Sequence, residues 1–106
     1  MDVLDHSPQR WFLLADGDQL YLDANVHEGA VGLSVLIALE AEEVQELQEK
    51  GVDFLDALSD DIQRSAPFAR GSASRYRSRD LSASLEVEVA EAVDRWRQRA
   101  VNESAD

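Results

Sequence analysis

The stretch QLYLDANV, residues 19–26, alternates apolar and polar side chains without a break. One face would carry Leu20, Leu22, Ala24 and Val26, and the other face would carry Gln19, Tyr21, Asp23 and Asn25. Side chains along a β-strand point to opposite faces with a period of two, so this stretch predicts a strand with one buried face.

Two neighbouring stretches extend this strand into a meander. Asp16-Gly17-Asp18 lies between apolar runs, and Asp-Gly in that position is a strong hairpin signal because glycine adopts positive φ without steric cost. A second turn precedes another alternating stretch that begins at Val31. Short turns join antiparallel strands. The sequence therefore predicts a three-stranded antiparallel β-meander at about residues 10–15, 19–26 and 31–39.

The apolar period changes after the third strand. Apolar or small residues now recur at steps of three and four, which is the pattern of one helix face: Val44, Leu47, Gly51, Leu55, Leu58 and Ile62. Glycine is the usual residue just past a helix end. We therefore expect helices at about 41–49 and 52–65, with a single kinked helix as the alternative.

The last apolar segment fits two patterns. Alternation from Leu81 to Val89 is typical of a strand, whereas Leu85, Val89 and Trp96 follow helical spacing. We favour one helix at about 82–100, and a strand at 81–89 followed by a short helix is the alternative.

These elements predict an α+β fold, because the strands come first and the helices follow. We expect a single domain over 1–106, with flexible tails at 1–9 and 101–106 and a long Arg/Ser-rich loop at 66–80. The helices should cover the sheet face of Leu20, Leu22, Val35 and Ile37. The opposite face, with Tyr21, Asp23, Asn25, Ser34 and Leu36, would be open to solvent or to a partner. We expect that a homodimer could form through this face or through a sheet edge, because an unpaired edge is a template for strand pairing.

Charge divides the chain into two unequal parts. Residues 1–63 hold fifteen acidic residues against Arg10 and Lys50, while residues 64–106 hold eight arginines against seven acidic residues. The net charge of −12 argues against general binding to DNA or to anionic membranes, because phosphate neutralisation needs a basic face. Any contact with nucleic acid would be local to the arginine-rich segment.

Composition and short motifs argue against several further kinds of site and against a membrane protein. The chain has no cysteine, which excludes disulfides and thiolate metal sites and is compatible with a reducing cytoplasm, where we expect the protein. Its longest nearly apolar run, Ala30–Leu39, is far shorter than the about 20 residues of a membrane helix. Asp16, Asp18 and Asp23 could offer oxygen ligands to a hard cation, but the remaining ligands of a calcium loop are missing. We therefore expect no membrane association, no metal and no cofactor.

The segment RGSASRYRSR is the first candidate site, as a binder of an anionic ligand or of nucleic acid. Arginine forks bind phosphate or carboxylate, and an interleaved aromatic ring can stack on a base. Its candidate ligand-binding residues are Arg70, Arg75, Tyr76, Arg77 and Arg79. In a chain this acidic, the same arginines can instead pair with the protein's own carboxylates.

The second candidate site is the glutamate-rich stretch of the first helix, as an acidic docking face for a protein partner. Its candidate residues are Glu42, Glu43 and Glu46, since charge complementarity steers association. No nucleophile with a matching base can be identified, and His27-Glu28 is best explained as a solvated turn. The sequence therefore favours a non-catalytic protein-interaction or regulatory module. Binding of an anionic ligand through residues 70–79 is the alternative.

Overall fold

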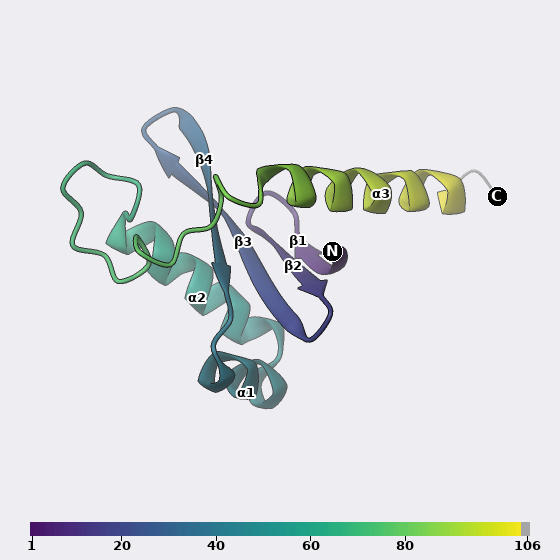
Figure 1. Ribbon diagram of the computed structural model, residues 1–106, viewed down its shortest axis with the longest axis horizontal. Coiled ribbons are helices and arrows are strands. Elements are labelled where there is room, and N and C mark those ends of the chain that lie inside the picture. The colour runs from purple at the N-terminus through teal and green to yellow at the C-terminus, as the bar shows by residue number, and fades with distance from the viewer. Residues whose placement is uncertain (105–106) are drawn as a thin grey trace.

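The computed structural model describes residues 1–104 and shows an α+β fold with an antiparallel sheet and three helices (Figure 1). The sheet is a meander in which each strand pairs with the next one along the chain. Its strands are β1 Asp2–Ser7, β2 Trp11–Asp16, β3 Gln19–Glu28 and β4 Val31–Ala38. The α+β class and the predicted meander are confirmed, but the prediction of three strands is wrong, because the sheet has four.

The additional strand is β1, which lies in the segment predicted to be a flexible tail. The pairing of β1 with β2 is irregular between Val3 and Asp5, and the bulge there leaves Leu4 exposed. A bulge breaks the period of two. Only Val3 of this strand is buried in the core, while His6 contacts the ring of Trp96 at a centroid distance of 4.5 Å. The strand therefore carries almost no alternation in its sequence.

The two predicted helices after the sheet are confirmed as α1, Ala41–Lys50, and α2, Val52–Ser65. A capping box between Glu40 and Glu43 fixes the start of α1. Gly51 separates α1 from α2 and has a φ of 67°. A positive φ favours glycine, because glycine has no Cβ to clash with the backbone. The two helices are therefore distinct, and the alternative of one kinked helix is wrong.

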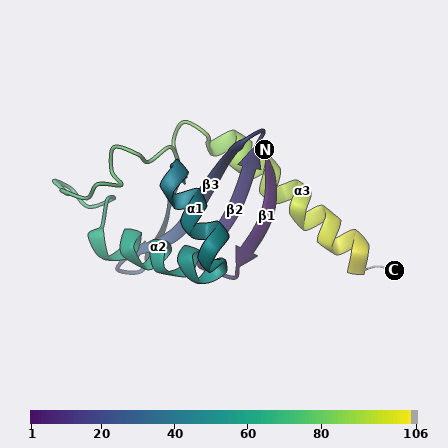
Figure 2. The ribbon, with the colours of Figure 1, turned by 90° about the horizontal axis from the view of Figure 1, so that it is seen from below.

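Helices cover both faces of the sheet, as the view in Figure 2 shows. On one face, α1 and α2 pack on a core that includes Leu22, Val35 and Ile37. On the other face, α3, Glu86–Ser104, packs through Ala92, Val93 and Trp96. The strand residues beneath α3 are Phe12, Leu14, Tyr21 and Leu36.

The prediction that all helices share one face is therefore wrong for α3. The physical reason is that β2 and β4 carry apolar side chains on both faces, so that Leu14 and Leu36 need a second cover. The face that we expected to be open to solvent or to a partner is partly occupied by the protein's own last helix.

The segment that leads into α3 is pinned to the outer edge of β4. Leu81 donates its N–H to the carbonyl of Leu36 at 2.7 Å, and Asp80 accepts from the N–H of Leu36 at 3.1 Å. The helix then begins at Glu86, four residues later than predicted, and the alternative strand at 81–89 is excluded. The predicted C-terminal tail is helical through Ser104, and residues 105–106 lie outside the described part of the chain. None of the helices within residues 1–104 combines the length with the apolar composition that a membrane-spanning helix requires.

Candidate functional site: an acidic groove

The connection between α2 and α3 folds back on α2 and inserts Tyr76 into the core. The Tyr76 side chain is fully buried, and its hydroxyl donates a 2.5 Å hydrogen bond to Asp61 Oδ2. Arg75 Nη2 donates to the same oxygen at 3.0 Å. The Tyr76 hydrogen bond, with Arg75 and Arg64 nearby, holds the pKa of the Asp61 carboxyl below its usual range. Tyr76 is therefore a core residue, and its ring is not presented for stacking on a ligand.

Arg79 joins this connection to α1 and to the end of β4. Its guanidinium bonds Glu43 Oε1 at 2.5 Å and lies 3.3 Å from Glu40 Oε1. A third bond runs from Arg79 Nη2 to the carbonyl oxygen of Ala38, at 2.8 Å. The hydrogen bond with Glu43 is the main cause of a raised pKa at Arg79. The structure thus pairs a residue of the predicted anion site with a residue of the predicted docking face.

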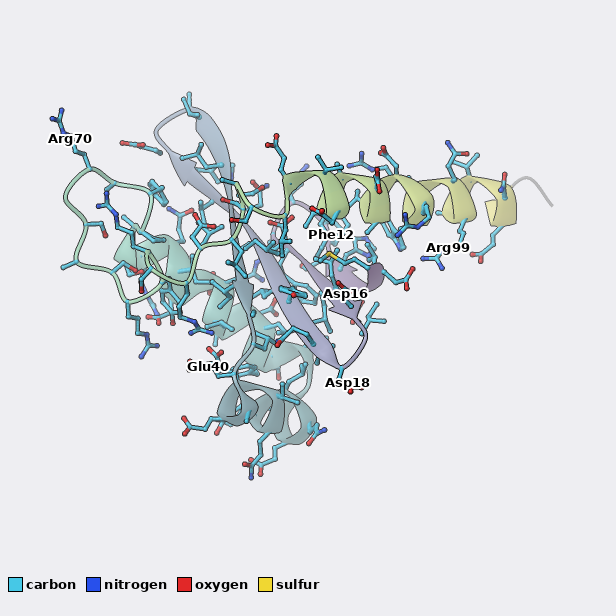
Figure 3. The ribbon with its side chains drawn as sticks, viewed as in Figure 1. Phe12, Asp16, Asp18, Glu40, Arg70 and Arg99 are labelled. Atoms are coloured by element: carbon cyan, nitrogen blue, oxygen red, sulfur yellow. The ribbon has the colours of Figure 1, made fainter. Side chains whose placement is uncertain are left out.

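The other two arginines of the predicted anion site remain exposed. Arg70 lies at the outer bend of the connection and points away from the protein (Figure 3). Arg77 donates to the backbone carbonyl of Ala69 at 3.2 Å. Neither residue forms an ion pair with another residue of the described chain.

A cavity of about 410 Å³ opens where α1, α2 and the connection meet, and we call it the acidic groove. Glu40 marks its position, at the junction of β4 and α1 (Figure 3). Phe54 and Leu58 of α2 supply its apolar lining. Its charged lining comes from Glu40, Glu42, Glu43, Glu46, Arg75 and Arg79.

Internal pairing leaves the acidic groove with surplus negative charge. Arg79 is shared between Glu40 and Glu43, and Glu43 has only 16% of its side chain exposed. Glu46 lies 2.5 Å from Lys50, an exposed one-turn pair of the kind that contributes little. Glu42 is exposed and has no ion pair within residues 1–104. Of the three predicted docking residues, Glu42 and Glu46 are therefore available at the rim, and Glu43 holds the fold.

A second feature is Asp23, which the sequence placed on the open face of the sheet and not among the candidate site residues, and which the structure places on the α3 face of β3. Burial, followed by the nearby charge of Asp80, raises the pKa of Asp23 from 3.8 to about 6. The signal available in the sequence was an acidic residue within an alternating strand, on a face that was wrongly expected to be open. No cluster of three metal-ligating side chains exists in the part of the chain that the structure describes.

No protein-family model, curated protein sequence or solved structure matches this chain. The interpretation of the site therefore rests on its geometry and charge. These define a class of site, an acid-rimmed groove with an apolar floor on a two-sided α+β sheet protein.

Proposed function

We propose that this protein is a non-catalytic interaction module that binds a basic segment of a partner protein in the acidic groove. The observation that carries the proposal is the surplus of carboxylates around an apolar floor. The lining has four glutamates against two arginines, and both arginines already have carboxylate partners inside the protein.

The chemistry of the acidic groove matches a lysine or arginine side chain. Such a side chain has an apolar stem and a charged head, and it buries the stem while the head stays hydrated. The stem would lie on Phe54 and Leu58, and the head would meet Glu42 and Glu46 at the rim. The net charge of −12 adds a long-range field that steers a basic partner toward the protein.

The arginine-rich connection contributes to this function by shaping the acidic groove. Arg79 fixes Glu40 and Glu43 against the body of the protein, and Tyr76 anchors the connection in the core. A site held in place before binding loses less conformational entropy when its ligand arrives. The connection therefore acts as a wall of the binding site.

A charge-matched pair of variants tests the proposal. The probe is a fluorescein-labelled peptide of alternating lysine and leucine, followed by fluorescence anisotropy at low salt. Each exposed ion pair contributes up to about 1 kcal/mol, so Glu42→Gln with Glu46→Gln should weaken binding by roughly 5–30-fold. The control, Glu88→Gln with Glu91→Gln, removes the same charge from exposed positions of α3. Equal loss of affinity in both variants would show that the peptide responds only to net charge.

Anion binding through residues 70–79 is the competing hypothesis, and it depends on fewer residues than the sequence suggested. Tyr76 is in the core, while Arg75 and Arg79 are paired with carboxylates. Only Arg70 and Arg77 remain to receive an anion, and they are supported by a turn-rich connection without helix or strand.

A further inference from the structure

A second cavity lies on the opposite face of the sheet and is lined by residues of β3, of β4 and of the start of α3. Its volume is about 200 Å³. Its apolar lining comes from Leu36, Val89 and Ala90, and its polar lining comes from Asp23, Ser34, Ser82 and Glu86. We call it the Asp23 cavity, and it shares no lining residue with the acidic groove.

Asp23 has no structural role that would explain a carboxylate at this place. Its side chain forms no hydrogen bond or ion pair with any residue of the described chain, and Leu36 and Phe12 are its partners in the strand ladder. Asp80, by contrast, accepts hydrogen bonds from the N–H groups of Leu36 and Ser82 and so holds the connection on β4. A partly buried carboxylate without a partner is costly.

The charged groups around Asp23 leave it without compensation. Asp80 comes from the connection and Glu86 from α3, and both carry the same sign of charge as Asp23. Arg10, from the turn between β1 and β2, lines an adjoining cavity of about 120 Å³ that also includes Asp23. The Arg10 guanidinium is bound to Asp56 and Asp60 on the other side, at 3.3 and 3.1 Å. The Asp23 cavity is therefore negative, and its own side chains do not neutralise it.

We propose that the Asp23 cavity binds a primary alkylammonium group. The three N–H donors of an ammonium ion can be shared between the Asp23 carboxylate and the hydroxyls of Ser34 and Ser82. A short alkyl chain would lie against Leu36, Val89 and Ala90, which form the apolar lining. An organic cation suits the cavity better than a metal ion, because no three metal-ligating side chains converge within residues 1–104.

The ammonium group can come from a free amine or from a lysine side chain, and the edge of β4 offers a way to tell them apart. The connection covers this edge at Leu36 and Ala38. Along an antiparallel edge strand, every second residue directs its backbone N–H and C=O away from the neighbouring strand. Gly32 and Ser34 share this orientation with Leu36, so their backbone groups also lie at the free edge of β4. A peptide carrying the lysine would pair with Gly32 and Ser34, whereas a free amine would not.

The first experiment is an amide NMR titration with n-butylammonium at about pH 7.5, where Asp23 is ionised. We expect saturable shifts at Leu36, Val89 and Ala90, with a dissociation constant of about 1 mM for so small a ligand. n-Butanol, which has the same chain without charge, should produce no saturable shift. A parallel titration with a blocked Val-Thr-Lys-Thr-Val peptide assigns the source, since only a strand-forming lysine segment shifts Gly32 and Ser34 as well.

Three variants decide the outcome. Asp23→Asn should weaken n-butylammonium binding by at least about tenfold, and Ala90→Leu, which fills the cavity without changing charge, should abolish it. Asp18→Asn, at an exposed hairpin turn, is the charge-matched control and should bind as the wild type does. Absence of saturable shifts in the wild type, or unchanged binding in either cavity variant, would overturn the proposal. Glu42→Gln with Glu46→Gln should leave n-butylammonium binding unchanged. The proposal for the Asp23 cavity and the proposal for the acidic groove can therefore be tested independently of each other.

Discussion

Replacing Asp23 by asparagine should raise the stability of the protein at neutral pH, because it removes a partly buried negative charge that has no partner within residues 1–104. The pKa of Asp23 is raised from 3.8 to about 6 in the folded protein, chiefly by burial. One pKa unit corresponds to about 1.36 kcal/mol, so keeping Asp23 ionised in the fold costs at most about 3 kcal/mol. Solvent reaching the partly buried carboxylate reduces this figure, and we expect a gain of about 2 kcal/mol.

The sign of the effect fixes its pH dependence. The folded state holds the Asp23 proton more tightly than the unfolded state, so the contribution of Asp23 to the stability of the wild type falls as pH rises from about 4 to about 6. Asp23→Asn cannot ionise and avoids this loss. Its advantage should be complete above about pH 6 and should disappear below about pH 4, where Asp23 is protonated in both states.

Urea denaturation of the two proteins across this pH range measures the effect. Other titrating groups are common to both proteins and cancel in the difference, and Asp18→Asn controls for the loss of one exposed charge. The reasoning is refuted if Asp23→Asn is less stable than the wild type at neutral pH. It is refuted equally if the difference in stability is independent of pH.

Three further predictions concern the connection between α2 and α3. Arg79→Leu should destabilise the protein by about 2 kcal/mol in urea denaturation, because Arg79 donates a hydrogen bond to the Glu43 carboxylate and hydrogen bonds to charged groups contribute about 1.5–3 kcal/mol. An unchanged urea midpoint would show that the Arg79–Glu43 pair does not stabilise the fold. Tyr76→Phe keeps the buried ring but removes the hydroxyl, so we expect a loss of about 1 kcal/mol. The pKa of Asp61, followed by carboxyl NMR, should rise in this variant. An unchanged pKa would mean that the Tyr76 hydroxyl is not the main cause of the lowered pKa of Asp61. Arg70→Ala with Arg77→Ala should change neither stability nor affinity for the lysine–leucine peptide, whereas loss of binding to inorganic phosphate in this variant would favour the anion hypothesis.

The regular elements were predictable because each has a clear period in the sequence. β3 alternates over residues 19–26, and the stripe from Val44 to Ile62 has helical spacing. β1 was missed because its bulge and its single buried side chain, Val3, leave no alternation to detect. The position of α3 was missed because apolar positions on the second face, such as Leu14 and Leu36, were not counted as a surface that needs cover.

The candidate sites were harder to predict because their pairing is long-range. Arg79 and Glu43 are 36 positions apart, and only the path of the connection across the edge of β4 brings them together. Composition did suggest that arginines could pair with acidic residues inside the chain, and Arg75 and Arg79 do so. The sequence could not tell which carboxylates remain unpaired. That distinction separates Glu42, at the rim, from Glu43, in the fold, and it leaves Asp23 alone beneath α3.

The most direct test of the proposed function is to map where the lysine–leucine peptide binds, by amide NMR of the wild type and of Glu42→Gln with Glu46→Gln. If the acidic groove is the binding surface, the largest shifts will cluster on the first turns of α1 and around Phe54 and Leu58, and they will be lost in the variant. Shifts spread over the acidic surface of α2 and α3, with the same pattern in the variant, would contradict it.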